Sequence, residues 1–394
     1  MNIVFAYITP FHPNKGGIGR VTDSLTRELQ KRGHKIWYLI YDSPITIRHE
    51  YNYPAPLSYL PSRDLLSEDN LIAYHEFLKK NDIDIVINQS GNFDDSRLWL
   101  NTGSNKAKVI SVVHTPPIVN YRYLFSELSQ IRGDRLIDWV KCGARICLYP
   151  KLKREILKTR RGHYNYLLPR TDAVCTLSEH FFDEIDWLCH GYQDKYFAIN
   201  NPNSYCFDNN AIPSIKKKRI VWVGLFSEQK RPTQVIRIWK KLYKDFPDWE
   251  LDIVGYNKNF GWNERMKKLA SGLPRINLVG YQDPVKYQKE ASIAILTSSY
   301  EGWGMVLTEA MQCGAVPVAF DSFSSIKDII DDGNNGLLVK PFSSKDFADK
   351  LAYLMSHPDA LSKMSENARQ SVRKFDIEPI ADRWEELFHT LIGN

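Results

Sequence analysis

The chain has 394 residues, 43% of them hydrophobic and 25% charged, which is typical of a globular protein with two domains of ordinary size. Its net charge of +6 suits phosphate-bearing ligands or an anionic membrane face. No block of basic residues resembles a nucleic-acid-binding tail, so we expect no nucleic-acid partner. The six cysteines are scattered without a Cys-x-x-Cys pair, and the sequence shows no signal-peptide pattern, so we expect a cytoplasmic protein. We expect no transmembrane helix, because no apolar run approaches roughly 18 residues.

The first half of the chain begins with a strand–helix–strand pattern. Residues 2–9 are apolar and rich in β-branched side chains, which predicts a buried parallel strand. A glycine-containing loop, a helix with apolar residues from Ile18 to Leu29, and a strand at 35–41 follow. Further strands are expected at 83–88, 108–113 and 172–177, whereas 42–70 is expected to be a loop and 120–170 irregularly helical.

A second strand–helix series starts near residue 215, after a charged linker at 216–219. Its strands are expected at 220–224, 251–255, 276–280, 292–297, 315–320 and 336–340. The restart predicts two α/β domains, at 1–205 and 215–376. The last segment, 377–392, carries apolar side chains in helical register and is expected to cover the face of a sheet.

Two glutamates stand out in the stretch 299–320. Glu301 lies on a loop just beyond the strand at 292–297, and Glu309 lies about one turn into the helix that follows. Ligands of open α/β sheets bind at the carboxyl ends of strands. We therefore expect Glu301 to face a transferred group and Glu309 to pair with vicinal ribose hydroxyls. The alternative is a pair of surface glutamates joined by a packing loop.

The residues between the glutamates suit a phosphate group. Gly302 and Gly304 allow a close backbone approach, and the first N–H groups of the helix can bind an anion. Those N–H groups belong to Met305, Val306 and Leu307.

This stretch resembles the Glu-x7-Glu signature of retaining glycosyltransferase family 4. That family has the GT-B fold, with two Rossmann-like doubly wound domains facing each other across a cleft, and its last helix packs back on the N-terminal domain, which here would be 377–394. The usual Glu-Gly-Phe-Gly reads Glu301-Gly302-Trp303-Gly304 here, so Trp303 replaces a phenylalanine. The resemblance covers both halves and is strongest from 218 to 342.

The resemblance also implies a cationic clamp on the donor diphosphate. The family places an arginine and then a lysine after the first strand of its C-terminal domain. Lys230 matches the lysine, but Leu225 stands where the arginine is expected, and Arg231 is the candidate to replace it. Cations at these positions would stabilise the charge that grows on the leaving diphosphate. A solvated turn is the alternative.

Further donor-site and acceptor-site positions follow from the same resemblance. Gly16 and Gly17 open the first helix, where the family has a glycine-rich loop that approaches the donor phosphates. His114 follows the strand at 108–113 and would lie near the transferred sugar and the acceptor, unless it merely caps the strand. Tyr281 lies where the family holds the nucleotide base, largely by main-chain contacts.

Residues 151–170 contain seven Lys or Arg against one Glu. Such a segment could dock on an anionic membrane leaflet that holds a lipid-linked acceptor, or it could be a solvated helix face.

These features together predict a retaining hexosyltransferase. It would move a sugar from a nucleotide-diphosphate donor, with UDP expected because it is commonest in the family, to a sugar or lipid-linked saccharide. Cell-surface polysaccharide or lipopolysaccharide synthesis is the expected setting. We expect no cofactor and no metal, because Lys230 and a helix N-terminus would replace the metal and no Asp-x-Asp motif lies between strands. Two alternatives remain open: a Rossmann-fold oxidoreductase, opposed by the missing Gly-x-Gly-x-x-Gly, and a catalytically weak nucleotide-sugar-binding protein, favoured by Leu225.

Overall fold

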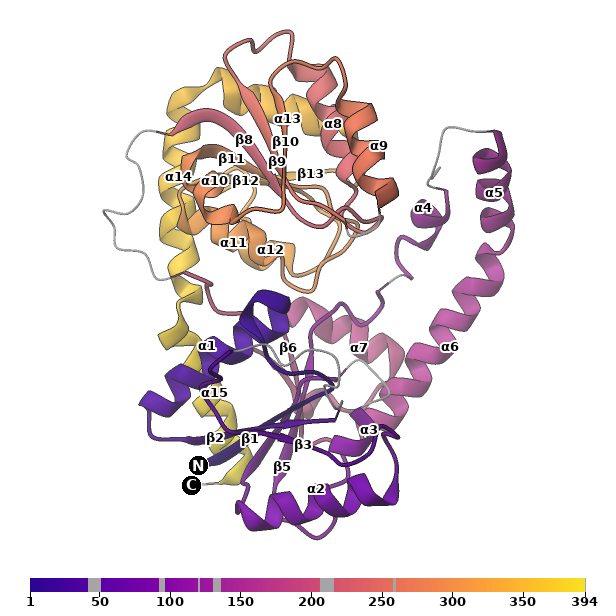
Figure 1. Ribbon diagram of the computed structural model, residues 1–394, viewed down its shortest axis with the longest axis vertical. Coiled ribbons are helices and arrows are strands. Elements are labelled where there is room, and N and C mark those ends of the chain that lie inside the picture. The colour runs from indigo at the N-terminus through magenta and orange to yellow at the C-terminus, as the bar shows by residue number, and fades with distance from the viewer. Residues whose placement is uncertain are drawn as a thin grey trace. The chain divides into compact units, whose positions relative to one another are not determined.

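The computed structural model describes residues 1–41, 51–91, 96–119, 121–129, 136–205, 216–257 and 260–393. The chain forms two compact units (Figure 1): the N-terminal unit, Met1–Pro202 with Ile377–Asn394, and the C-terminal unit, Asn203–Asp376. Asn203 belongs to the second unit because its side-chain amide donates to the carbonyl of Val372 and to the carboxylate of Asp376. The first unit therefore ends slightly before the predicted limit of 205, and the connection 206–215 lies outside the described residues.

The N-terminal unit is built on a parallel sheet with the strand order β3-β2-β1-β4-β5-β6-β7. Its strands are β1 (Asn2–Tyr7), β2 (Lys35–Ile40), β3 (Leu57–Tyr59), β4 (Ile85–Asn88), β5 (Lys108–Val113), β6 (Ala173–Thr176) and β7 (Tyr196–Ala198). Its helices are α1 (Gly17–Lys31), α2 (Glu68–Lys80), α3 (Ser96–Trp99), α4 (Leu124–Leu128), α5 (Leu136–Cys147), α6 (Tyr149–Leu167), α7 (Phe182–Leu188) and α15 (Ile377–Ile392).

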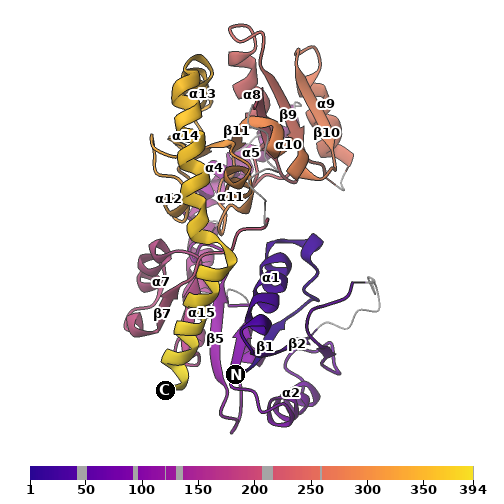
Figure 2. The same cartoon turned by 90° about the vertical axis from the view of Figure 1, so that its left-hand side faces the viewer.

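Both faces of this sheet are buried, which explains why its strands read as continuous apolar runs. Along β1, Phe5 points into a core shared with α1 and α15, whereas Val4 points into a core shared with α2, α3, α6 and α7. Helix α15 runs beside α1 (Figure 2) and buries Trp384 and Phe388 against the sheet. Arg32, at the end of α1, adds ion pairs to Asp382 and Glu385 of α15. The apolar stripe of the last helix thus lies on the N-terminal unit.

The C-terminal unit contains a second parallel sheet, with the order β10-β9-β8-β11-β12-β13. Its strands are β8 (Lys217–Val223), β9 (Glu250–Val254), β10 (Ile276–Gly280), β11 (Ala291–Leu296), β12 (Val316–Phe320) and β13 (Leu337–Val339). Its helices are α8 (Pro232–Leu242), α9 (Phe260–Ala270), α10 (Pro284–Glu290), α11 (Met305–Gln312), α12 (Ile326–Ile329), α13 (Ser344–Ser356) and α14 (Pro358–Ser371). Short 3-10 turns lie at Pro13–Lys15, Glu179–Phe181, Gln193–Lys195 and Val372–Phe375.

Two sequence expectations were wrong in detail. The charged segment 217–219 is part of β8 and not a linker, because Arg219 lies among the carboxylates of Glu250, Asp252 and Glu290, which neutralise it. The expected loop 42–70 contains β3 and the start of α2, although its part from 42 to 50 lies outside the described residues.

Each sheet reverses its strand order once, and these points position the candidate site. In the first sheet, β2 and β3 lie on one side of β1, and β4 begins the series on its other side. In the second sheet, β9 and β10 lie on one side of β8, and β11 begins the series on its other side. Loops that follow adjacent strands at such a switch point diverge and leave room for a ligand. Among the described residues, no helix is both long and apolar enough to cross a membrane.

Candidate active site

In the C-terminal unit, the loops after β8 and β11 are fastened together at the switch point. The backbone N–H of Ser299 donates to the carbonyl of Gln229 at 2.7 Å, and the Gln229 side chain donates to the carbonyl of Tyr300 at 2.9 Å. The Thr297 hydroxyl donates to the carbonyl of Lys230 at 2.8 Å. These bonds place Lys230 beside Glu301, although the two residues are 71 positions apart in the sequence.

Lys230 and Glu301 form an ion pair in this structure. Nζ of Lys230 lies 2.5 Å from Oε1 of Glu301, and the Ser298 hydroxyl donates to the same oxygen at 2.6 Å. The Glu301 side chain is 10% exposed and that of Lys230 is 22% exposed. Because both groups are largely withdrawn from water, each compensates the charge of the other. A phosphate that binds Lys230 would have to exchange with the Glu301 carboxylate.

Helix α11 starts directly after the Glu301 loop. Gly304 precedes it with φ +92°, a left-handed conformation that favours glycine, and the Ser325 hydroxyl fixes the loop by donating to the carbonyl of Gly302. The first N–H groups of a helix lack intrahelical partners, which leaves those of Met305 and Val306 suited to bind an anion. Leu307 differs, because its N–H donates to the carbonyl of Gly304 at 2.8 Å and its side chain is fully buried. A phosphate contact from Leu307 would require its N–H to leave the carbonyl of Gly304.

Trp303 lies inside the C-terminal unit rather than on its surface. The side chain is 2% exposed, and its ring meets that of Phe375 edge-on at 5.0 Å. Its side chain therefore anchors the loop that carries Glu301, and any donor contact from Trp303 would have to come from its backbone.

Glu309 lies on α11 one turn beyond the helix start and is 3% exposed. Its Oε1 accepts a hydrogen bond from the Ser204 hydroxyl at 2.8 Å. Such a nearly buried, oriented carboxylate can accept hydrogen bonds from two neighbouring hydroxyl groups of a ligand.

Arg231 is held in the interior next to Lys230. Its Nε donates to the Ser299 hydroxyl at 2.6 Å, and its guanidinium lies 3.7 Å from the ring centroid of Phe342. These contacts give Arg231 a structural role at the start of α8. Leu225, at the expected arginine position, is 57% exposed and supplies no charge.

Tyr281 follows β10, at the edge of the sheet. It is 72% exposed, and its ring meets that of Tyr256 at 4.9 Å. β10 lies two strands away from β8, so Tyr281 is separated from the Lys230–Glu301 pair by the end of β9.

The predicted residues of the N-terminal unit lie after β1 and after β5, the two strands on either side of β4. Gly16 and Gly17 lead from β1 into α1, and His114 follows β5. Gln89, directly after β4, links the two, because it donates to Thr22 of α1 at 3.2 Å and accepts a hydrogen bond from Nε2 of His114. Burial lowers the pKa of His114 to about 4, so its imidazole is neutral at pH 7.

Three polar residues of these sites were missed by sequence reasoning: Ser298, Ser204 and Gln89. Ser298 and Gln89 follow the apolar runs of β11 and β4, and a polar residue at a strand end was the available signal. Ser204 had no such signal, because its contact with Glu309 spans 105 positions.

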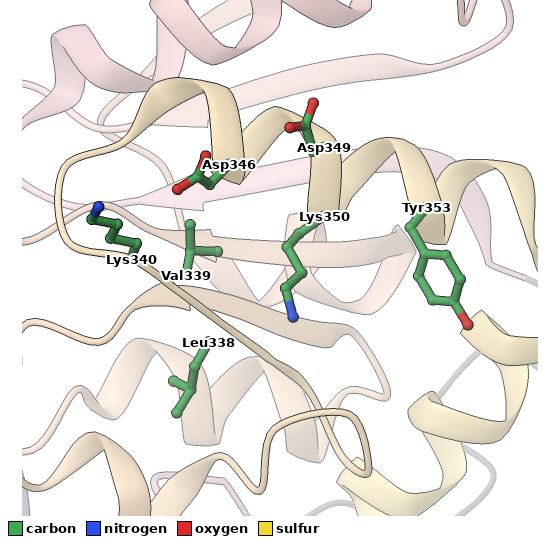
Figure 3. A pocket seen from close by; sticks show the side chains of 7 residues that line it. All are labelled: Leu338, Val339, Lys340, Asp346, Asp349, Lys350 and Tyr353. Carbon is green, nitrogen blue, oxygen red and sulfur yellow. The ribbon is translucent and has the colours of Figure 1, made fainter.

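A separate pocket of about 480 Å³ lies between β13 and α13 (Figure 3). It is lined by Leu338, Val339, Lys340, Asp346, Asp349, Lys350 and Tyr353. None of the predicted site residues belongs to it.

Both halves of the chain match known family models. Residues 15–202 match the model described as glycosyltransferase family 4, and residues 208–371 match the one described as glycosyl transferases group 1. Both models describe glycosyltransferases, which does not support the oxidoreductase alternative considered from the sequence.

Among curated proteins, the chain is 28% identical over 222 residues to an uncharacterized glycosyltransferase of Haemophilus influenzae, covering 54% of this chain and 60% of the relative. It is 31% identical over 230 residues to an exopolysaccharide phosphotransferase of Streptomyces coelicolor, covering 57% of this chain but 24% of the relative. It is 23% identical over 400 residues to the N-acetyl-alpha-D-glucosaminyl L-malate synthase of Bacillus anthracis, covering 97% of this chain and 96% of the relative. The chain thus spans less than two thirds of the length of the first two relatives.

Among solved structures, HepE of Anabaena in complex with UDP and glucose has a TM-score of 0.72 at 14% identity, covering 99% of this chain and 100% of that one. TarM has a TM-score of 0.71 at 15% identity, covering 98% of each chain. These likenesses show the predicted GT-B fold, with its two parallel-sheet α/β domains. With one family model on each unit, the chain belongs to glycosyltransferase family 4.

Proposed function

We propose that the protein transfers a hexosyl unit from a nucleotide-diphosphate sugar to a sugar or lipid-linked saccharide, with retention of the anomeric configuration. One arrangement carries the proposal: the Lys230–Glu301 ion pair beside the start of α11, with Glu309 one turn further along that helix. The cation and the helix N–H groups suit the diphosphate of such a donor. The carboxylate of Glu309 suits the hydroxyls of its ribose. UDP is the proposed nucleotide, in line with the UDP complex of the structurally similar HepE.

Donor binding would rearrange the ion pair. The diphosphate takes the place of the Glu301 carboxylate at Lys230, and Glu301 then accepts hydrogen bonds from hydroxyls of the transferred sugar. As the glycosidic bond breaks, negative charge grows on the leaving diphosphate and strengthens its contacts with Lys230 and the N–H groups of Met305 and Val306. In this scheme no metal is required, Glu301 orients the sugar without becoming a nucleophile, and the leaving phosphate takes the proton of the acceptor on the same face. His114, neutral at pH 7, would meet the sugar or acceptor as a hydrogen-bonding group.

For the biological setting we propose cell-surface polysaccharide or lipopolysaccharide synthesis by a cytoplasmic protein in peripheral contact with the membrane. The likeness to an exopolysaccharide phosphotransferase supports a polysaccharide product, and the basic segment 151–170 supports the membrane contact.

The competing proposal is a nucleotide-sugar-binding protein with weak activity. It is favoured by Leu225, which leaves Lys230 without the arginine expected beside it, since Arg231 is engaged with Ser299 and Phe342.

Incubating the purified chain with UDP-, GDP- and ADP-sugars and measuring released nucleoside diphosphate separates the proposals. Slow release from one donor class, accelerated by an acceptor, would support the transferase. Binding of a donor without release would favour the weakly active binding protein, and neither binding nor release would overturn both.

A further inference from the structure

Helix α5 exposes its apolar side chains, unlike an ordinary surface helix. Leu136, Ile137, Trp139 and Val140 are 81%, 47%, 61% and 61% exposed, and we call these four residues the α5 apolar surface. In a surface helix of a globular protein, such an apolar side normally faces the core. Here the one buried residue of the helix is Cys142.

The other side of α5 is the one that contacts the protein. The Cys142 thiol and Nε of Arg145 both donate to the carbonyl of Leu128 in α4, at 3.7 and 3.3 Å. In the N-terminal unit, α4 and α5 lie at the end of α6 that is remote from the sheet (Figure 1). The α5 apolar surface therefore faces away from the core of its own unit.

A stripe of basic side chains runs along the neighbouring helix. Lys151, Arg154, Lys158 and Arg161 of α6 are all exposed, and we call them the α6 basic stripe. Their spacing of three, four and three residues places them on one face of the helix. The acidic Glu155 lies 3.9 Å from Lys151, and both side chains are well exposed, so this pair neutralises little of the stripe.

We propose that α5 inserts its apolar surface into the interface of an anionic lipid bilayer, while the α6 basic stripe binds the lipid headgroups. An apolar side containing tryptophan and aliphatic residues, next to Lys and Arg, is the pattern of a helix that lies in a membrane interface. The positive charge selects an anionic bilayer, because exposed basic residues attract its negative surface potential. This inference rests on the proposed function, because membrane binding would bring the protein to a lipid-linked acceptor. It also identifies α5 as the helix that enters the bilayer.

Vesicle flotation with the whole chain tests the proposal. Vesicles of phosphatidylcholine alone are compared with vesicles that also contain phosphatidylglycerol, at low and at raised salt. The chain should float with the anionic vesicles, and raised salt should weaken this binding. The double variant Trp139→Ser/Val140→Ser should bind on the order of tenfold more weakly or worse, because two exposed side chains lose their place among the acyl chains.

The chain offers a matched control in Leu66→Ser/Ile72→Ser, which removes two side chains that are 57% and 51% exposed elsewhere in the N-terminal unit. This variant should float like the unchanged chain. The charge variant Arg154→Glu/Lys158→Glu should lose the preference for anionic vesicles. Brominated lipids should quench tryptophan fluorescence less in Trp139→Ser/Val140→Ser than in the control.

Three outcomes would overturn the proposal: no binding of the unchanged chain to anionic vesicles, equal binding by Trp139→Ser/Val140→Ser, or a dimer in solution that this variant converts to a monomer. The last would assign the α5 apolar surface to a second copy of the chain. Transfer to a short water-soluble acceptor should stay unchanged in Trp139→Ser/Val140→Ser, which also shows that the variant folds. Loss of vesicle binding with intact transfer would therefore show a defect in membrane binding alone. Absence of transfer in the unchanged chain would instead contradict the proposed function.

Discussion

Nζ of Lys230 lies 2.5 Å from Oε1 of Glu301, so the proposed phosphate-binding cation and the proposed sugar-binding carboxylate neutralise each other. This relationship changes what substitutions at either position can be expected to do. Removing one member leaves the other largely buried and without its opposite charge.

Glu301→Gln should separate diphosphate binding from transfer. The glutamine can still accept the hydrogen bond from Ser298, but it no longer competes with phosphate for Lys230. We therefore expect calorimetry to show equal or tighter binding of the nucleoside diphosphate. The rate of transfer should fall roughly 10- to 150-fold, because the sugar loses a charged hydrogen-bond acceptor. This factor corresponds to a loss of about 1.5–3 kcal/mol of transition-state stabilisation. Clearly weaker diphosphate binding would contradict this assignment.

Lys230→Ala should lower kcat more than it weakens donor binding, because the charge that Lys230 meets is greatest in the transition state. Loss of such a contact costs about 2.7–4 kcal/mol. The exposed Lys345, which pairs with Asp349 on α13, supplies the control Lys345→Ala, which should leave the kinetics unchanged. Adding Glu301→Gln to Lys230→Ala should restore part of any lost thermal stability, since no uncompensated carboxylate remains. Full activity of Lys230→Ala would place the clamp elsewhere.

Glu309→Gln should weaken the nucleoside diphosphate and the intact donor alike. A carboxylate that pairs with ribose hydroxyls contributes about 1.5–3 kcal/mol, and the ribose is common to both ligands. Calorimetry with both ligands measures this, and Ser204→Ala, which removes the partner of Glu309 but keeps the carboxylate, should have a smaller effect. If Glu309→Gln and Glu301→Gln changed diphosphate binding equally, the division of roles between the two glutamates would be wrong.

His114 should make the protein less stable as the pH falls. Its pKa is lowered by burial to about 4, below the ordinary value of 6.5 that it regains on unfolding. Between these values the unfolded chain binds a proton that the folded chain does not, so stability decreases as the pH falls from about 6.5 towards 4. Thermal unfolding at pH 7, 6 and 5 should therefore show a smaller decrease in Tm for His114→Gln than for the unchanged chain. A larger decrease in the variant would mean that His114 carries a charge in the folded protein.

The strands were predictable because a sheet buried on both faces needs continuous apolar runs. The expected strand at 108–113 is confirmed as β5, and that at 315–320 as β12, and nearly all residues of both strands are buried. The short β3 was missed because it is only partly buried and lies in a stretch rich in proline, serine and tyrosine. The charged start of β8 was missed because Arg219 needs three carboxylates that the fold brings from other segments.

The sequence predicted which elements carry the residues of the candidate site better than it predicted which of these residues contact each other. Strand ends and a helix start, read from the pattern around Glu301, correctly placed this residue on a loop and Glu309 on a helix. The pairing of Lys230 with Glu301 depends on β8 and β11 being neighbours in the sheet, which local sequence does not specify. The stacking of Arg231 on Phe342 likewise joins residues that are remote in the sequence.

The stereochemistry of transfer shows most clearly whether the protein uses a UDP-sugar donor with retention. The chain is supplied with a UDP-sugar of known anomeric configuration and a saccharide acceptor, and the new glycosidic bond is observed by NMR, with Lys230→Ala and Glu309→Gln run in parallel. We expect UDP release coupled to a product with the configuration of the donor, and strongly reduced product with both variants. A product of inverted configuration would contradict retention, and unchanged product with both variants would contradict the proposed donor site.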